Sequence, residues 1–126
     1  MGLDMYLEGK KNLGFNKTQT EDGFELKEKT LRLGYWRKHP NLHGYIVQNF
    51  AGGKDECQEI ELSEENINQI IQAIKDKALP HTTGFFFGSS DESYDQPSIE
   101  MLEKALAWLK TEVIDEWRSV VYQASW

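Results

Sequence analysis

Cysteine is nearly absent from this 126-residue sequence, in which Cys57 stands alone. A single cysteine excludes an internal disulfide framework. Long apolar runs are also missing, because no stretch approaches the roughly 18 apolar residues of a membrane helix. The segment 1–4 lacks the basic and apolar regions of a signal peptide, and Tyr6 stands where a myristoylation signal requires Ser or Thr. We therefore expect a reduced cytoplasmic protein without a membrane partner.

Basic charge is in deficit, with 14 Lys and Arg residues against 21 Asp and Glu residues and a net charge of −7. This sign disfavours association with a phosphate backbone, so a nucleic-acid partner is not expected. The acidic residues are dispersed, without a run of five or six, which argues against the alternative of a nucleic-acid mimic. The nucleotide-binding patterns Gly-x-Gly-x-x-Gly and Gly-Lys-Ser are absent as well, and the sequence implies no cofactor.

Aromatic residues, in contrast, are abundant, with four Trp, five Tyr and six Phe. Their large side chains supply the buried area that a disordered chain lacks. The length fits a single domain over residues 1–126. We therefore expect one folded core, with the polar segment 9–23 as a long loop.

Two extended segments are predicted in the first third of the chain. Apolar and polar residues alternate over 1–7, a period typical of a half-buried strand. The stretch 24–36 also alternates, but its apolar residues change parity part-way. Because a slip of one residue turns every side chain to the other face, we expect a bulge or break over 27–30.

The rest of the chain alternates between helical and extended patterns. In order, it predicts a helix from Pro40 to Gly52-Gly53, a strand over 55–62, a helix capped by Ser63 that runs to Ala78, a helix capped by Asp95 or Ser98 that runs to Val113, and a strand over 117–126.

The segment 79–90 stands out because three consecutive phenylalanines, residues 85–87, lie between Gly84 and Gly88. A short apolar run bounded by turn residues predicts a strand that is buried on both faces. A helical pattern lies on each side of it, so we place it at the centre of the sheet. Phe86 is then expected to be fully buried between helices and sheet.

The resulting order is strand, strand, helix, strand, helix, strand, helix, strand. It predicts an α+β domain of two layers, with a mixed sheet of about five strands and three helices. Loops gather at the carboxyl ends of parallel strands, where ligands usually bind. We therefore expect Arg37 and His43 to lie near Gly88 and Ser89.

The densest group of functional side chains is the segment 34–43, at a predicted strand-to-helix junction. Free backbone N–H groups and the positive helix end favour an anion there, and Arg37 and Lys38 add charge. Trp36 can stack on a ring or a guanidinium. In the alternative, Trp36 belongs to the core and the basic pair is a solvated corner. The ligand-binding set that we predict is Trp36, Arg37, Lys38, His43, Cys57 and Ser89.

A metal site is a weaker alternative. His39 and His43 are four residues apart, a spacing that places two imidazoles on one helix face. Further ligands would come from Asp55, Cys57 and His81. However, His39 precedes the predicted helix, and neither Cys-x-x-Cys nor His-Glu-x-x-His occurs. We therefore predict no metal ion.

Catalysis is a further alternative. Cys57 shares the parity of Glu59 and Glu61, so it falls on the wet face of its predicted strand, where a histidine can activate the thiol. A lone cysteine is more often a small buried hydrophobe. The enzyme hypothesis is a small hydrolase or transferase that uses His43 with Cys57 or Asp55.

Several short motifs occur together in this chain: Tyr-Trp-Arg-Lys at 35–38, Asp-x-Cys at 55–57, Gly-Phe-Phe-Phe-Gly at 84–88 and Tyr-x-x-Ser-Trp at 122–126. In this combination the chain resembles a family of small phage and prophage proteins. The resemblance implies an accessory protein in the host cytoplasm that counters host defence or adjusts host metabolism. It carries over no catalytic residue. The leading hypothesis is therefore a protein that binds a host protein or a small anionic or polar ligand.

Overall fold

The computed structural model describes residues 2–14, 17–84 and 87–126, and over these residues the chain is an α+β protein, as predicted. Within them the elements in chain order are β1 (Asp4–Leu13), β2 (Gln19–Glu21), β3 (Phe24–Leu26), β4 (Glu28–Arg37), α1 (Pro40–Phe50), β5 (Ile60–Leu62), α2 (Glu64–Lys75), a short 3-10 helix η1 (Glu92–Tyr94), α3 (Asp95–Lys110) and β6 (Glu116–Ser125).

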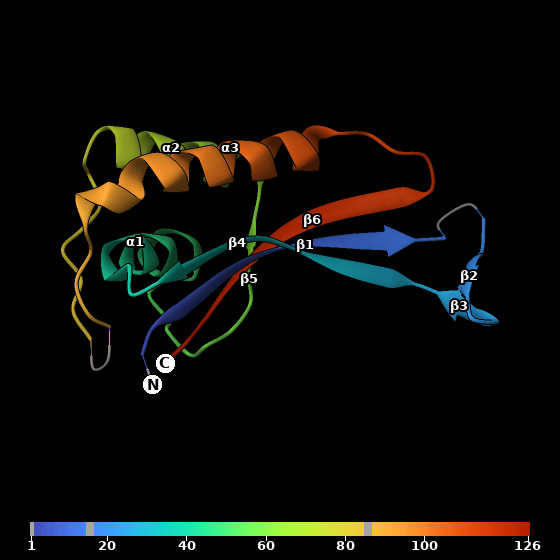
Figure 1. The fold of residues 1–126 in the computed structure, drawn as a ribbon, viewed down its shortest axis with the longest axis horizontal. Helices are drawn as coiled ribbons and strands as arrows, with labels where there is room; N and C mark the ends of the chain where they lie inside the picture. The colour runs from blue at the N-terminus through green and yellow to red at the C-terminus, as the bar shows by residue number, and fades with distance from the viewer. Residues whose placement is uncertain (1, 15–16, 85–86) are drawn as a thin grey trace.

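The described strands form a sheet of order β4-β1-β6-β5 and a separate β2-β3 pair. Every pairing among them is antiparallel, so the predicted mixed sheet is an antiparallel one. Figure 1 shows α2 and α3 side by side over the sheet, with α1 nearer the end where the two termini meet. The strands extend past the helices at the opposite end, toward β2 and β3 (Figure 1).

The prediction of a central strand over 79–90 is wrong. The described parts of this segment, 79–84 and 87–90, contain no strand, and β1 and β6 occupy the inner positions of the sheet. Phe85 and Phe86 lie outside the described residues, so the prediction for Phe86 is not addressed. Phe87 is buried, with its ring 5.5 Å from that of Trp126. An apolar run requires burial but not a strand, and here a loop packed on the core provides the burial.

The alternating amino-terminal pattern is confirmed, since Leu3, Met5 and Leu7 are fully buried. The strand does not end there, however: β1 continues to Leu13, which lies within the segment predicted as a loop. β1 pairs with β4 on one side and β6 on the other over this polar half. The Lys10 ammonium lies 2.8 Å from the Glu59 carboxylate. Ladder hydrogen bonds and ion pairs therefore hold a segment whose sequence shows no apolar alternation.

The break expected over 27–30 is also present, because β3 ends at Leu26 and β4 begins at Glu28. A second irregularity was not predicted. Leu7 pairs with Gly34 and Glu8 pairs with Arg32, which leaves Leu33 as an extra residue in β4. This bulge turns the Trp36 side chain into the core and leaves Tyr35 about two-fifths exposed. Both residues line the aromatic cleft described below.

The helices begin close to the predicted residues. α1 has Pro40 in its first turn, and Ser63 caps α2 by accepting a hydrogen bond from the Asn66 N–H at 3.1 Å. α3 begins at Asp95, but neither Asp95 nor Ser98 caps it. The predicted strand over 55–62 shrinks to β5, because residues 54–58 form a loop held by the Gln58 side chain.

Candidate functional site

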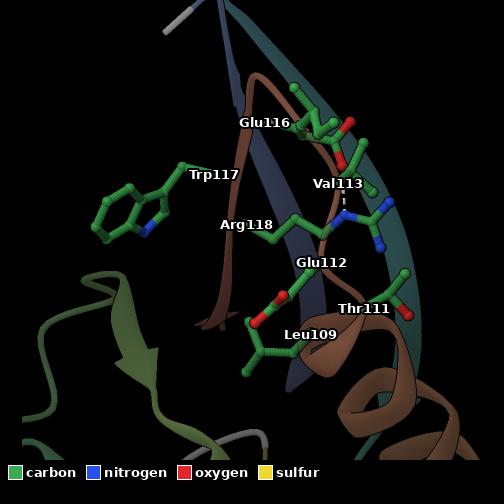
Figure 2. Close-up of a pocket in the computed structure, with 8 residues that line it drawn as sticks. Leu109, Thr111, Glu112, Val113, Glu116, Trp117 and Arg118 are labelled. Carbon is green, nitrogen blue, oxygen red and sulfur yellow. Dashed lines mark hydrogen bonds and ion pairs between the residues drawn. The ribbon is translucent and has the colours of Figure 1, made fainter. Parts of the chain in front are cut away.

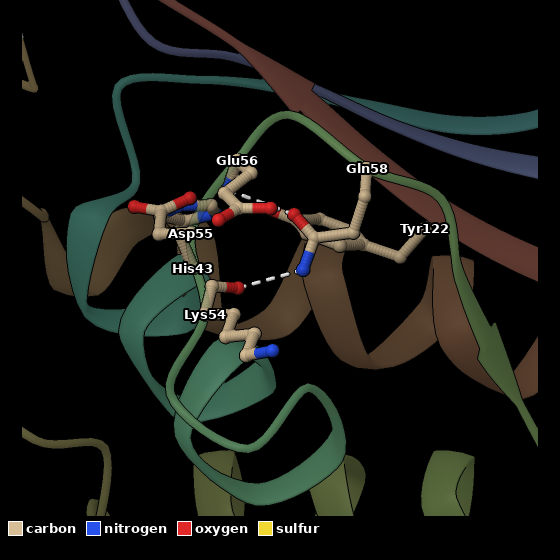
Figure 3. Close-up of polar contacts among 6 residues, drawn as sticks. All are labelled: His43, Lys54, Asp55, Glu56, Gln58 and Tyr122. Carbon is tan, nitrogen blue, oxygen red and sulfur yellow. Dashed lines mark hydrogen bonds and ion pairs between the residues drawn. The ribbon is translucent and has the colours of Figure 1, made fainter.

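His43 lies in a buried polar chain at the end of the molecule near the termini. Its Nε2 is 2.9 Å from Asp55 Oδ1, and its Nδ1 is 2.6 Å from the Tyr122 hydroxyl. A carboxylate only accepts, so Nε2–H donates to Asp55 and Nδ1 accepts from Tyr122. Figure 3 shows how the 54–58 loop carries Asp55 to the imidazole while Gln58 bonds the backbone on both sides of it.

The inner part of this chain is closed to solvent, whereas Asp55 at its outer end is exposed. His43 is 2% exposed and Tyr122 is 0% exposed, and the ring of Phe87 packs 5.4 Å from the imidazole. Burial, with a smaller contribution from the Asp55 charge, raises the pKa of Tyr122 well above its ordinary value. Both imidazole nitrogens are engaged, so neither is available to take a proton from a substrate. The arrangement organises the core more readily than it catalyses a reaction.

Cys57 follows Asp55 in the same loop and is half-buried. Its backbone has a φ of 58°, and its carbonyl oxygen accepts a hydrogen bond of 2.8 Å from the Gln123 amide. His43 and Asp55 are therefore in contact, as one form of the hydrolase hypothesis requires. The hydrogen bond at Cys57, in contrast, is made by its backbone carbonyl.

Arg37 and Lys38 lie together around Gly2. A Cβ atom added to Gly2 would be 3.1 Å from Arg37 Nη2 and 3.2 Å from Lys38 Cε. The Lys38 side chain also runs along Gly88, where an added Cβ would lie 2.9 Å from its Cδ. In the described parts of the chain Lys38 makes no ion pair. Two positive charges therefore share one neighbourhood on a protein whose net charge is −7.

The Arg37 guanidinium is held in place from its own strand and from β1. Its Nη1 is 3.0 Å from Asp4 Oδ1, and the Tyr35 hydroxyl donates to the same oxygen. The Tyr35 hydroxyl and the Asp4 charge raise the pKa of Arg37. The hydrogen bond to Asp4 raises the pKa of Tyr35, so the phenol stays protonated at neutral pH.

An aromatic cleft of about 270 Å³ opens between β4 and α3. Its lining residues are Tyr35, Trp36, Arg37, Tyr94, Pro97, Ser98 and Met101. The Trp36 indole N–H donates to Ser98 Oγ at 2.8 Å, and the Ser98 hydroxyl donates to the Tyr94 carbonyl. These bonds fix the Trp36 ring as a wall of the cleft. Sequence reasoning identified Trp36 and Arg37 but missed the α3 side, because nothing local links Tyr94 to β4.

The predicted residue Ser89 is exposed, whereas its neighbour Ser90 makes hydrogen bonds at the start of α1. Ser90 Oγ lies 2.8 Å from His39 Nδ1 and accepts the Asn41 backbone N–H at 3.0 Å. The six predicted residues therefore do not form one site. Lys38 lies beside Gly88 and His43 beside Phe87, whereas Trp36 lines the cleft between β4 and α3.

A larger hollow of about 630 Å³ lies where α3 turns into β6. Figure 2 shows Arg118 directed at Glu116 while the Trp117 ring points away from them. The Arg118 guanidinium also donates to the Trp108 carbonyl at 2.8 Å, so Arg118 and Glu116 are paired internally, whereas Glu112 adds a further carboxylate to the lining. Ile114 is 88% exposed and Trp117 is 63% exposed. This end of the sheet thus combines an acidic rim with unburied apolar groups.

The described residues offer no cluster of three or more His, Cys, Asp or Glu side chains that could hold a metal ion. His39 and His43, the pair considered for zinc, instead bond to Ser90 and to Asp55 with Tyr122. Over the same residues, the helices are too short or too polar to cross a membrane.

Comparison with family models, with curated proteins and with solved structures finds no match to this chain. The resemblance to phage and prophage proteins therefore stays a prediction.

Proposed function

We propose that this chain is a binding protein whose ligand is a small organic anion with a flat ring. The observation that carries the proposal is the aromatic cleft between β4 and α3, with the Arg37 guanidinium on its lining. In the setting that the phage resemblance implies, the ligand is a host metabolite.

The walls of the cleft suit a ring. Tyr35 and Tyr94 are each about two-fifths exposed, and Trp36, Pro97 and Met101 complete an apolar surface. Aromatic side chains gain energy from stacked or edge-on contacts beyond the area that they bury. A volume of about 270 Å³ lies just under the range of roughly 300–1,000 Å³ typical of drug-sized ligands. The ligand is therefore small, on the scale of one ring and its substituents.

The charge at the rim suits an anion. Arg37 offers planar donors that match carboxylate and phosphate geometry, and Lys38 brings a second positive charge beside it at Gly2. Asp4 already engages one Arg37 nitrogen and so competes with the ligand. Binding is then expected to be moderate and to weaken with salt.

Phenyl phosphate is a suitable probe, with benzyl alcohol as the uncharged comparison. We expect phenyl phosphate to raise the melting temperature and to move the Trp36 indole N–H signal in NMR spectra. Ligand at about 100 times its dissociation constant stabilises a protein by roughly 2.7 kcal/mol. Arg37→Ala should abolish both effects. Arg32→Ala is the matched control, because Arg32 lies in the same strand with its guanidinium over the Tyr6 ring and does not line the cleft.

Two results contradict the proposal. One is the absence of any shift with phenyl phosphate at millimolar concentration. The other is an equal loss in Arg37→Ala and Arg32→Ala, which would show attraction to any surface arginine and not binding in the cleft.

A second candidate function is the binding of a host protein at the far end of the sheet. The exposed Ile114 and Trp117 side chains favour it, since acidic residues rim this apolar surface. The partner would carry an apolar patch with basic residues around it. Ile114→Asp should abolish capture of one such protein from host lysate, whereas Arg37→Ala should leave that capture intact. The reverse pattern would assign the interaction to the cleft.

A further inference from the structure

A second cavity, of about 160 Å³, is lined by the start of α1, the end of α2 and the segment 90–95. Its polar lining consists of His39, Asn41, Lys77, Ser90, Asp91, Glu92 and Asp95. The Tyr94 ring packs 5.5 Å from the His39 ring, and the acidic residues come from η1, from Asp91 just before it and from the start of α3. The proposed function does not use this cavity.

The His39 imidazole is the most informative group here. It is 2% exposed, and its Nδ1 is 2.8 Å from Ser90 Oγ. Its Nε2 is buried and has no hydrogen-bond partner among the described residues. A buried polar atom without a partner is costly, and His39 is a lining residue of the cavity, so the orphaned Nε2 points to a bound group.

The neighbours of His39 indicate which kind of group would bind. Ser90 Oγ accepts the Asn41 N–H and has a second lone pair, which Nδ1–H can fill. Nε2 is then an unprotonated acceptor, and a buried orphan acceptor is less costly than a buried orphan N–H. An acceptor in this position calls for a donor on the ligand.

The charges of the cavity favour a cationic donor. The lining carries three carboxylates, Asp91, Glu92 and Asp95, but only one ammonium group, that of Lys77. The Lys77 ammonium lies 3.5 Å from Glu92 at the exposed rim. Asp95 is half-buried, and its carboxylate makes no hydrogen bond or ion pair within the described residues. An uncompensated carboxylate and a neutral acceptor on one cavity match the three donors of an ammonium group.

We propose that this cavity binds a small primary amine in its ammonium form, with the ammonium group shared between His39 Nε2 and Asp95. Water occupies about 30 Å³ per molecule in the liquid, so about 160 Å³ accommodates an amine of only a few heavy atoms. Ile74 and Leu79 on the lining would contact its alkyl part.

The test uses n-propylamine as the probe, with 1-propanol and propionate as neutral and anionic comparisons of similar size. We expect saturable binding of n-propylammonium alone by calorimetry at neutral pH. The nitrogen NMR spectrum of the unliganded protein should show His39 with its proton on Nδ1. Addition of n-propylamine should shift the Nε2 signal.

Asp95→Asn should weaken n-propylamine binding by roughly tenfold or more, because a hydrogen bond to a charged group is replaced by a neutral one. Asn is well tolerated at the start of a helix, so this variant should fold. Glu103→Gln is the matched control, since it removes one exposed negative charge from the same helix outside the cavity. It should leave the affinity unchanged.

Three outcomes would overturn the proposal. The first is a His39 proton on Nε2 in the unliganded protein. The second is an absence of saturable binding, which would leave water as the occupant. The third is an equal effect of Asp95→Asn and Glu103→Gln, which would show attraction to net charge alone.

Discussion

Histidine is common in active sites, but His43 is a buried residue that links parts of the core by hydrogen bonds. Its two ring nitrogens bond to Asp55 and Tyr122, and aromatic rings exclude solvent from it. A buried polar chain of this kind is stable only while every member keeps its partner. The energetic role of each side chain can therefore be measured by removing one hydrogen-bonding group at a time.

Tyr122→Phe should lower the free energy of unfolding by about 1–3 kcal/mol, because it leaves His43 Nδ1 buried without a partner. Urea denaturation at pH 7 would measure this loss. Asp55→Asn is the comparison: its amide oxygen can still accept the Nε2 proton, and its side chain is 31% exposed, so the loss should be under about 1 kcal/mol. A Tyr122→Phe variant as stable as the wild type would show that Nδ1 has another partner.

His39 should make stability depend on pH. Burial lowers its pKa from 6.5 to about 4 in the folded protein. As pH falls through 6.5, the unfolded chain takes up the proton first, so the free energy of unfolding decreases until the folded pKa is reached. The His39 contribution is thus intact above pH 6.5 and is lost toward pH 4, by at most about 3 kcal/mol.

The measurement is urea denaturation of the wild type and of His39→Gln between pH 7.5 and 4. The difference between their unfolding free energies should decrease as pH falls, because Gln does not titrate. A difference that is constant over this range would show that His39 titrates equally in both states.

Gly34 determines how closely α3 approaches β4. A Cβ at this position would clash with the Met101 sulfur. Because Gly34 has no side chain, α3 can pack close to β4 and close one side of the cleft. The bulge at Leu33 turns Gly34 toward the helix and Trp36 into the core. The close packing of β4 against α3 thus depends on Gly34 in the strand and Met101 in the helix.

Gly34→Ala should destabilise the protein by about 1–3 kcal/mol through overpacking against Met101. The double variant Gly34→Ala with Met101→Ala should show a coupling that recovers part of this loss, since the clash is then removed. Thermal and urea denaturation of the two single variants and the double variant would measure it. Strictly additive losses would place the strain elsewhere.

How far an element could be predicted depended on whether its signal was local. The alternation of Leu3, Met5 and Leu7, the Ser63 cap and the break before β4 lie within a few residues, and each is present. The phenylalanine run correctly indicated burial of Phe87, but burial does not specify a strand.

The candidate site was less predictable for the same reason. Trp36 and Arg37 stood out in a dense local motif, but their cleft needs Tyr94 from η1 and Pro97 from α3. The bond between His43 and Tyr122 joins residues 79 positions apart, and no short-range pattern encodes it. Cys57 and Ser89 were chosen from their chemistry and from their places on two predicted strands, and neither lines the cleft.

In the whole molecule, stability is concentrated at the helix-covered end. The β2-β3 pair lies beyond the helices, and Phe24 at its turn is 77% exposed (Figure 1). β6, in contrast, pairs with both β1 and β5 and contributes the buried residues Val120, Tyr122 and Ala124. Two segments of similar length therefore differ greatly in their importance for folding.

Replacement of residues 14–26 by Asn-Gly should shift the melting temperature by no more than about 4 °C, the change expected for about 1 kcal/mol in a domain of this size. Leu13 and Lys27 are already joined by a backbone hydrogen bond of 2.9 Å, and Asn-Gly favours a tight hairpin turn. Removal of residues 117–126 should instead abolish the cooperative transition. Circular dichroism melts of both variants would test this, and a cooperative melt without β6 would contradict it.

The pairing of β1 with β6 also has a consequence for the order of folding during synthesis. Met5 pairs with Ala124, so the centre of the sheet joins residues that lie far apart in the order of synthesis. Until β6 emerges, β1 has only β4 beside it, and the apolar faces of α1 and α2 have no complete sheet to cover. Such long-range pairing slows folding and lengthens the time for which apolar surface is exposed. The nascent chain is therefore expected to depend on chaperones until β6 has left the exit tunnel.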